Sequence, residues 1–556
     1  MRIFIQSFTG EFPRIHETRL KEDAAARAEN VSFMSGTLKP MFKVSDYKTL
    51  APMEGGSITK EVYRFRIDDG AYWLQFSKDV DVILSPIKDD QHHRIYWTGD
   101  SRGGGAPLFA KGLEAVSENE PYPQTYRKLG VPAPTNIVTI LSSTEATKDD
   151  TSDEVRFYVF TYVNDLGEES APSKPSGQVI VPRAAAEVRL GNLQVDSGAA
   201  DRNITAFRIY RTSVGTSGNA QWQYVGQTGF SNNEFLDNFM SEELDELLPT
   251  ENWDAPRNDM QGLGLTAYGV AYGFSGKIVC LSEPFYMYAF PRDYELTTQH
   301  NIVAMGHYDA NIIVVTDGNP VVVTGVSPTT GMTMTELPLN ESCVSKQSLV
   351  SLGYGVIYAS PNGLVLASNN GAQIISEGFF DRDEWNALNP ASIHAVEYKG
   401  RYLFFYKVDD ENKGAFIFDP KDLSSGLVRL NIWCISAHRD VKTDEIYLLQ
   451  ADGKLQYFDL NTRSGREKYL WRSKKFRASG NGCRMLAMRV IADSYQDLDV
   501  KIYANGEEFF RKSAVTDRPF RLPNHSPKSY WQIEITSTDE VREIVLGETM
   551  FEVMNG

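Results

Sequence analysis

The pattern that decides the fold is a turn followed by a short apolar run, and it first reads Phe274-Ser275-Gly276-Lys277-Ile278-Val279. Four further copies follow: Tyr308-Asp309-Ala310-Asn311-Ile312-Ile313, Leu352-Gly353-Tyr354-Gly355-Val356-Ile357, Tyr398-Lys399-Gly400-Arg401-Tyr402-Leu403 and Lys442-Thr443-Asp444-Glu445-Ile446-Tyr447. Alignment of Ile278, Ile312, Ile357, Tyr402 and Tyr447 gives steps of 34, 45, 45 and 45 residues. A repeat of about 40–50 residues made of hairpins is typical of β-propeller blades. Because one blade cannot bury both faces of its sheet, we expect the copies to stack around an axis.

Length and composition indicate a β-rich protein of several domains. A chain of 556 residues is too long for one hydrophobic core. Aromatic residues make up 12% of the chain, and flat rings pack well on pleated sheets. Helical patterns are few, and the best of them is the short, Ala-rich stretch of residues 20–30.

Charge and cysteine usage exclude some classes of protein. The formal net charge of −17 argues against binding of nucleic acid through a broad basic face. The basic run at residues 472–477 is better interpreted as a solvated strand edge. Four cysteines lie far apart without C-x-x-C spacing, which predicts buried free thiols in a reducing cytoplasm: Cys280, Cys343, Cys434 and Cys483. Without a signal-peptide pattern in residues 1–10 or a run of about 18 apolar residues, we expect neither export by the usual signal nor a membrane span.

Four segments are expected along the chain. Residues 1–130 form an N-terminal arm and the first propeller blade or blades, and residues 257–468 form the remaining blades. Residues 60–120 are interpreted as one further blade, because Tyr63-Arg64-Phe65-Arg66-Ile67 alternates and Asp68-Asp69-Gly70 turns. The propeller then has about six blades. Ring closure in propellers often joins distant strands, so the N-terminal arm is a natural supplier of one.

The other two segments are β-domains outside the repeat. Residues 131–256 contain about seven short strands with turn residues between them, which predicts an inserted β-sandwich. Two stretches, around Tyr162-Val163-Asn164 and Arg208-Ile209-Tyr210-Arg211-Thr212, resemble a fibronectin type III module. Residues 469–556 are interpreted as a C-terminal β-sandwich or jelly-roll-like domain, in which Asn505-Gly506 is a strong hairpin turn. The expected fold class is therefore all-β.

Candidate catalytic and ligand-binding residues are explained better as structure. Asp309, Asp317, Asp419 and Asp452 fall at expected blade turns, where aspartate bonds its own backbone. His92-His93 has no third metal ligand at useful spacing, and neighbours on a strand point to opposite faces. The glycine-rich residues 102–107 lack the Lys-Ser/Thr of a phosphate loop and are expected to form a flexible loop. We expect no catalytic, metal-binding or cofactor-binding residues and no enzymatic activity.

Several stretches together resemble the tail nozzle (tail tubular protein B-like) family of short-tailed bacteriophages. They are Gly10-Glu11-Phe12-Pro13-Arg14, Ser35-Gly36-Thr37-Leu38-Lys39-Pro40, Arg94-Ile95-Tyr96-Trp97-Thr98-Gly99-Asp100, Tyr162-Val163-Asn164-Asp165-Leu166-Gly167-Glu168-Glu169, Cys280-Leu281-Ser282-Glu283-Pro284-Phe285 and Tyr469-Leu470-Trp471-Arg472-Ser473-Lys474. The resemblance implies structural or interface roles for Phe12, Pro13, Arg14, Gly36, Leu38, Pro40, Tyr96, Thr98, Gly99, Gly167, Glu168, Ser282, Glu283, Pro284, Trp471, Arg472 and Ser473.

The resemblance implies a structural virion protein, made in the host bacterial cytoplasm and located in the phage tail. Six copies would form a ring below the portal and adaptor, as the distal DNA conduit and gate. The implied partners are other copies of the chain, the adaptor (tail tubular A-like) protein, tail fibre or spike proteins, and genomic DNA that passes without sequence-specific binding. The acidic balance is compatible with such a conduit, because a like-charged wall lets DNA slide. The alternative is a carbohydrate-binding or carbohydrate-cleaving propeller, either a lectin or a depolymerase.

Overall fold

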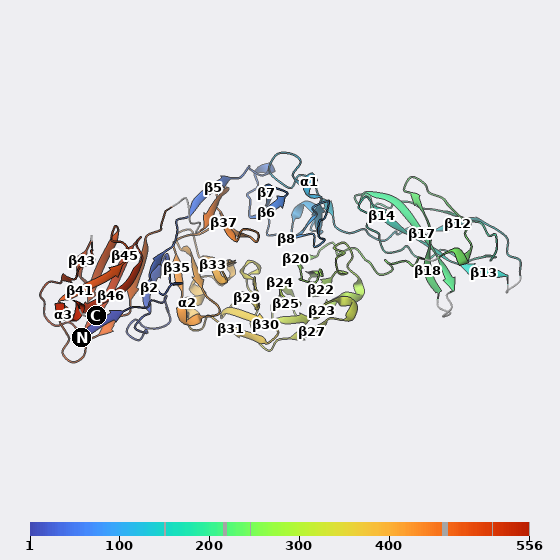
Figure 1. The fold of residues 1–556 in the computed structure, drawn as a ribbon. Helices are drawn as coiled ribbons and strands as arrows, with labels where there is room; N and C mark the ends of the chain where they lie inside the picture. Colours follow the sequence, from blue (N-terminus) through green and yellow to red (C-terminus); the bar gives the residue numbers. More distant parts are fainter. Residues whose placement is uncertain (149–151, 215–219, 245, 459–464, 514, 555–556) are drawn as a thin grey trace.

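The chain is built from three parts that lie in a row (Figure 1). The computed structural model describes residues 1–148, 152–214, 220–244, 246–458, 465–513 and 515–554. A β-sandwich that holds both termini lies at one end, a β-propeller lies in the middle, and an inserted β-sandwich lies at the other end. Helices are confined to short segments among the described residues, such as α1 (Gly112–Ala115), α2 (Arg382–Ala387) and α3 (Met550–Met554).

In the described part of the chain, the propeller contains six four-stranded blades and one two-stranded sheet. The two-stranded sheet is β6 (Glu61–Ile67) with β7 (Gly70–Phe76). The first two four-stranded blades are β8 (Asp81–Leu84), β9 (Ile95–Thr98), β10 (Leu108–Ala110) and β11 (Arg127–Lys128), and then β20 (Gln261–Leu265), β21 (Ala271–Ser275), β22 (Ile278–Leu281) and β23 (Leu296–Thr297). The next two are β24 (Ile302–Tyr308), β25 (Asn311–Thr316), β26 (Val321–Thr324) and β27 (Thr333–Glu336), and then β28 (Val350–Leu352), β29 (Gly355–Ser360), β30 (Gly363–Ser368) and β31 (Gly371–Ile374). The last two are β32 (His394–Tyr398), β33 (Arg401–Lys407), β34 (Lys413–Phe418) and β35 (Val428–Leu430), and then β36 (Ser436–Asp440), β37 (Glu445–Leu449), β38 (Lys454–Phe458) and β5 (Ser45–Thr49).

The first strands of these sheets follow one another around the ring. β8 contacts β20, and the contacts continue through β24, β28, β32 and β36 to β6. The step from β6 back to β8 is closed by an apolar core in which Phe65 and Phe76 pack with Trp97. The second strand of each blade is covered by sheets on both sides, so it forms a continuous apolar run rather than an alternating one. β25 and β29 are buried along almost their whole length, which explains the turn-plus-apolar pattern of the sequence.

The predicted repeat is correct in kind, but two of its assignments are wrong. Ile312, Ile357, Tyr402 and Tyr447 all lie on second strands, whereas Ile278 lies on the third strand of its blade, β22. The short step of 34 residues arose because the turn at Gly276 joins β21 to β22. Residues 60–120 are two sheets rather than one blade, because β7 and β8 do not pair and β8 begins a blade of its own. The predicted number of about six blades agrees with the six four-stranded sheets.

The N-terminal arm closes the ring, as expected. β5 pairs antiparallel with β38 and supplies the outer strand of the last blade. The next sheet, β6–β7, packs against this blade around Arg64. The Arg64 guanidinium lies 3.2 Å from Asp440 and 3.1 Å from Glu445, and it sits over the rings of Tyr447 and Trp73. Cation–π and ion-pair contacts of one buried side chain therefore join the two ends of the ring.

The inserted sandwich connects β11 to β20 and has a core of its own. Its strands form three short antiparallel sheets: β12 (Thr139–Ser143), β16 (Val188–Gly191) and β19 (Phe235–Asp237); β13 (Asp153–Arg156) and β15 (Val179–Pro182); and β14 (Tyr158–Asn164), β17 (Ile204–Val214) and β18 (Ala220–Gly229). Phe160, Tyr162 and Phe207 pack against one another in this core. Asp237 is fully buried, and it accepts hydrogen bonds from Arg211 at 2.6 Å and from Tyr158 at 2.7 Å. The buried carboxylate is thereby paired, as burial of a charge requires.

The C-terminal sandwich includes two strands from the start of the chain. One sheet contains β1 (Arg2–Ile5), β46 (Val541–Gly547), β41 (Ala487–Ala492) and β44 (Phe520–Arg521). The other contains β2 (Ala25–Glu29), β39 (Tyr469–Ser473), β45 (Tyr530–Ser537), β42 (Leu498–Ala504) and β43 (Glu507–Lys512), with β40 (Phe476–Arg477) beside β45. β2 also pairs parallel with β35, so one sheet runs without a break from the propeller into the sandwich. A separate hairpin, β3 (Val31–Ser32) and β4 (Lys39–Pro40), follows β2.

The helix predicted for residues 20–30 is wrong. Residues 25–29 form β2, because pairing with β39 and β35 provides hydrogen bonds that an isolated short helix could not match. Ala25 and Ala28 are fully buried in the core of the C-terminal sandwich. The Asn505-Gly506 turn is confirmed, since both residues have positive φ and join β42 to β43. All four cysteines are free and buried, as expected.

We predict that Arg64→Met opens the seam of the ring. The substitution removes Arg64 from Glu445 and from Asp440, which keeps its pair with Arg66, so stability should fall by about 2 kcal/mol, less than when a buried charge loses its sole partner. Hydrogen–deuterium exchange should show faster exchange in β5, β6 and β7 than in β25 or β29. Arg189→Met is the control, because the Arg189–Glu234 pair is about half exposed and should contribute less than about 1 kcal/mol. Equal effects of the two variants would contradict a special role for Arg64.

Candidate functional site at the propeller axis

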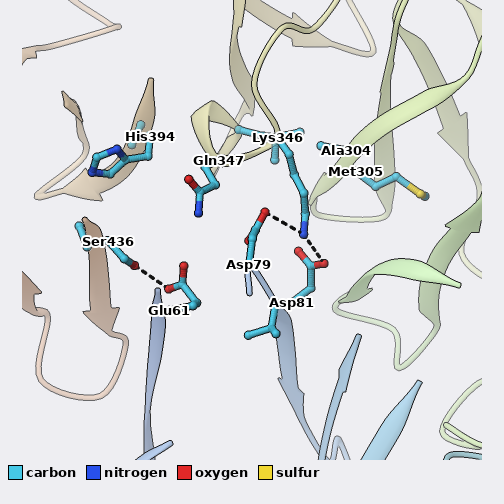
Figure 2. Close-up of a pocket in the computed structure, with 13 residues that line it drawn as sticks. Glu61, Asp79, Asp81, Ala304, Met305, Lys346, Gln347, His394 and Ser436 are labelled. Atoms are coloured by element: carbon cyan, nitrogen blue, oxygen red, sulfur yellow. Dashed lines mark hydrogen bonds and ion pairs between the residues drawn. The ribbon is translucent and has the colours of Figure 1, made fainter. Parts of the chain in front are cut away.

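A polar cavity of about 190 Å³ lies where the first strands of the propeller converge (Figure 2). Its polar lining comes from separate sheets and connections: Glu61 from β6, Asp79 and Asp81 from the start of β8, Lys346 from the turn before β28, and Ser436 from β36. Apolar residues such as Met305 and Ala395 complete the wall. The axis of a propeller brings the beginnings of its inner strands together, so residues far apart in sequence meet there.

Lys346 provides the positive charge of the cavity. Its Nζ atom lies 2.8 Å from Asp81 Oδ2 and 3.2 Å from Asp79 Oδ2, as the dashed lines in Figure 2 indicate. Burial by itself would lower the pKa of Lys346, but the charges of Asp81 and Asp79 raise that pKa above its usual value. Burial raises the pKa of Asp79, and Lys346 opposes this effect. The lysine is therefore held in its charged form between two carboxylates.

Glu61 occupies the other side of the cavity and carries a perturbed carboxyl group. Ser436 donates a hydrogen bond of 2.7 Å to Glu61 Oε1. Burial raises the pKa of Glu61 to about 8; the Ser436 hydrogen bond opposes this shift, and the charge of Asp79 adds to it. Near neutral pH this carboxyl group is therefore largely protonated, so Glu61 is an acid with a proton to donate.

His394 is part of the wall rather than of the charged cluster. Its ring turns away from Lys346 in Figure 2, stacks on Phe405 at 5.0 Å, and places Nε2 3.5 Å from the sulfur of Cys434. Burial lowers the pKa of His394 to about 4, so the imidazole is neutral at pH 7. Among the described residues, no group of three or more His, Cys, Asp or Glu side chains is arranged to hold a metal ion.

The sequence does not reveal this site. Lys346 and Asp81 are 265 residues apart, so no spacing motif connects them. The strand pattern could have suggested Asp81, because a charge at the start of an inner strand is unusual. The strand pattern could not have indicated that Lys346 is the partner of Asp81. The aspartates that were considered, including Asp317, Asp419 and Asp452, accept hydrogen bonds from nearby turn residues and do not line this cavity. His93 lies in a turn with positive φ, not on a strand as assumed, and β9 begins at Ile95.

None of the residues on which the family resemblance rests lines the axial cavity, and several of them lie where separate parts of the chain meet. Tyr96, Gly167, Glu168 and Pro284 are brought together around a second cavity of about 400 Å³, where the insertion meets the propeller. Glu168 is buried and accepts a hydrogen bond of 2.8 Å from Asn164. Ser282 and Glu283 lie next to this second cavity, just beyond β22. Ser282 is buried and bonded to the backbone of Ala271.

A second group of these residues joins the N-terminal arm to the rest of the chain. Phe12 packs on Phe379, and the backbone amide of Arg14 donates to Phe379 at 2.9 Å, with Pro13 between them. Leu38 is fully buried and forms a bridge with Val541 of β46. Gly36 has a φ of 75° in the β3–β4 hairpin, and Pro40 is buried at the end of that hairpin.

The remaining positions stabilise contacts between neighbouring blades, or between neighbouring strands and connections within one sheet. Thr98 accepts a hydrogen bond of 3.1 Å from the amide of Leu263, which joins the blade of β8 to the blade of β20. Gly99 has a φ of 90°, and a Cβ atom there would lie 2.5 Å from the Asp79 carbonyl oxygen. In β39, the indole of Trp471 donates to Thr9, Arg472 pairs with Glu534, and Ser473 accepts from the amide of Ile533.

Comparisons with known proteins add little to this description. No protein-family model matches the chain, and a search of curated proteins returns no match. Among solved structures, the chain is similar to the β-propeller domain of Cps50 (Swd1) from Myceliophteria thermophila, with 10% identity over 46% of this chain and 93% of that one and a TM-score of 0.21. It is also similar to the WD40 domain of Neurospora crassa Pan2 (8% identity, 51% and 87% coverage, TM-score 0.24) and to apo AztD from Citrobacter koseri (11%, 67% and 100%, 0.27). At these scores the propeller assignment rests on the strand pairings described above.

We predict that Lys346→Met destabilises the propeller in a pH-dependent way. Asp79 and Asp81 lose their cation, which should lower stability by about 2 kcal/mol at pH 7.5. The uncompensated carboxylates take up protons as the pH falls, so the deficit should shrink towards pH 4.5. Thermal unfolding of wild type, Lys346→Met and Lys346→Arg across this range tests the prediction. Arginine keeps the charge and should restore most of the stability; a pH-independent deficit in Lys346→Met would contradict the ion-pair explanation.

The raised pKa of Glu61 gives a second prediction. Between about pH 4.5 and pH 8 the folded chain holds a proton on Glu61 that the unfolded chain has released, so wild type should lose stability as pH rises through this window. Glu61→Gln removes the titration and should become more stable than wild type at pH 8, by about 2 kcal/mol. Chemical denaturation at several pH values measures the difference. Glu507→Gln, an exposed change of the same kind, should follow wild type; a similar gain in that control would refute the assignment.

Proposed function

We propose that this chain is a non-enzymatic structural protein of a short-tailed bacteriophage, and that six copies form the tail nozzle. In this proposal the ring lies below the portal and adaptor, continues the DNA conduit and ends in a gate. The adaptor protein, tail fibres or spikes, and other copies of the chain are its protein partners. Genomic DNA passes without sequence-specific binding, and the protein is located in the virion tail.

The observation that carries the proposal is the placement of the family-like residues. Several of them lie where the arm, the propeller, the insertion or the C-terminal sandwich meet, as with Tyr96 and Glu168 at one joint and Trp471 at another. Residues at joints specify how domains are arranged, whereas residues on one surface specify a ligand. A resemblance that includes several joints therefore supports a shared architecture, which is the property that a ring-forming structural subunit needs.

Two further features support the proposal. The insertion projects from the side of a propeller that is closed without it, so it is free to contact neighbours or other tail proteins (Figure 1). The net charge of −17 disfavours tight binding of DNA and favours its sliding past a wall. Among the residues that the structure describes, no helix is long and apolar enough to cross a bilayer.

Labelling of the protein on intact phage particles tests the proposal. Antibody against this chain, viewed by electron microscopy, should bind the distal tail, and averaged tails should show sixfold symmetry at that level. Native mass measurement of the assembled ring should give six times the 62.4 kDa chain mass. Label on fibres alone, or absence of label from every particle, would overturn the proposal.

A carbohydrate-binding or carbohydrate-cleaving propeller is the second candidate, because of the axial cavity. Glu61 is a carboxyl group with a pKa raised to about 8, and Asp81, in the same cavity, pairs with Lys346 at 2.8 Å. Two carboxyl groups in different environments of one cavity are an arrangement that glycoside hydrolysis uses. A panel of bacterial surface glycans tests this candidate: tight monomeric binding or cleavage that is lost in Glu61→Gln would favour it over the nozzle.

A further inference from the structure

The insertion is attached to the propeller at a narrow point. The incoming chain passes through Gly130 and the outgoing chain through Pro256, and a Cβ atom on Gly130 would lie 2.5 Å from Pro256 Cδ. The φ of 82° at Gly130 is one that residues other than glycine rarely adopt. Leu166 of the insertion packs beside this point on an apolar cluster that includes Tyr96 and Tyr288. Two segments of the chain meet at this glycine, beside the apolar contacts of Leu166 and Trp253 with the cluster, and we take this narrow attachment as a pivot.

Beyond the pivot, the insertion is held by charge. In the part of the chain that the structure describes, four ion pairs join the two parts, and each has its cation on the blade of β8 to β11 or its connections and its anion on the insertion. They are Arg94–Glu168 at 3.6 Å, Lys111–Asp165 at 2.7 Å, Arg127–Asp165 at 2.9 Å and Lys128–Asp201 at 3.0 Å. Glu168 is buried at the pivot, whereas Lys128 and Asp201 are both more than 40% exposed. The four pairs therefore range from largely buried to nearly half exposed.

The two central cations have a second, longer-range partner on their own side of the joint, and they contact it and Asp165 at the same time. Glu114 in α1 lies 3.5 Å from Lys111 and 3.5 Å from Arg127, and its side chain is 42% exposed. If Asp165 moves away, neither cation is left without a carboxylate. The cost of opening is therefore smaller than the loss of two ion pairs, because Glu114 replaces part of what Asp165 provides. Such a choice between two acceptors is what a two-state element requires.

We propose that the insertion is a hinged module, locked against the propeller by Asp165 and released when Lys111 and Arg127 pair with Glu114 instead. The pivot at Gly130 and Pro256 stays intact in both states. Salt shifts the balance towards release, because it screens the exposed pairs more than the buried Arg94–Glu168 pair. The proposal concerns this joint alone and holds whether or not the chain forms a tail nozzle.

Distance measurement between spin labels on the full chain tests the hinge. Labels at Ser231→Cys on the insertion and Asn370→Cys on the propeller use exposed positions, while the native cysteines are buried. At about 0.1 M salt wild type should give one distance, and a second should appear towards about 1 M salt, where the screening length falls to about 3 Å. Asp165→Asn should show the second distance already at about 0.1 M salt. A single distance that neither salt nor Asp165→Asn alters would overturn the proposal.

Two further variants separate the hinge from general effects of charge. Asp317→Asn removes an exposed aspartate that bonds Asn301 in a distant propeller turn, and it should behave as wild type. Glu114→Gln removes the alternative acceptor, so the second distance should need more salt than in wild type. A shift towards less salt in Glu114→Gln would refute the role assigned to that residue. The salt series on wild type decides the question even if Asp165→Asn fails to fold.

Discussion

The seam between the first and last parts of the propeller is the constraint on which the rest of the structure depends. A propeller is stable only when its ring is closed, because each sheet buries its faces against two neighbours. Here β5 completes the last blade, and the two-stranded sheet β6–β7 fills the adjoining place. This sheet buries Phe65 and Phe76 against the blade of β8 and Val62 and Trp73 against the last blade. Arg64, inserted among Asp440, Glu445 and Tyr447, adds directional contacts on the second side. From this seam follow the positions of the axis and of both flanking sandwiches.

Ion pairs connect separate parts of the chain both at the propeller axis and at the insertion. Lys346 lies between Asp79 and Asp81 where inner strands converge, and Asp165 lies between Lys111 and Arg127 where the insertion meets the propeller. In each case an ion of one part meets counter-ions of another that is distant in sequence. Apolar packing holds the interior of each sheet, as the buried runs of β25 and β29 show, but it does not fix the relative orientation of neighbours. Ion pairs with defined geometry add that orientation.

How far the sequence predicts this structure depends on the range of the interactions. The apolar runs around Ile312, Ile357, Tyr402 and Tyr447 predict the blades, because burial of second strands is imposed by the local fold. The Asn505-Gly506 turn is predicted for the same local reason. The strand at residues 25–29 is not predicted, because it depends on pairing with β39 more than 400 residues later in the chain. The axial cluster is not predicted for the same reason, since nothing near Lys346 in the sequence indicates that Asp81 is its partner. Short-range patterns specify elements, and long-range contacts specify sites.

The axial cavity also limits how the proposed nozzle could conduct DNA. The side chain of Lys346 lies at the ring axis between a cavity of about 190 Å³ and an adjoining one of about 500 Å³, and neither is large enough for a nucleic-acid duplex. DNA therefore has no route through the propeller of a single chain. In the proposed hexamer the conduit must lie between copies, along surfaces that each chain presents outwards. The internal pairing of Lys346 fits this arrangement, because a cation already neutralised by Asp79 and Asp81 offers nothing to a phosphate. The propeller would then act as a building block of the wall, not as the channel itself.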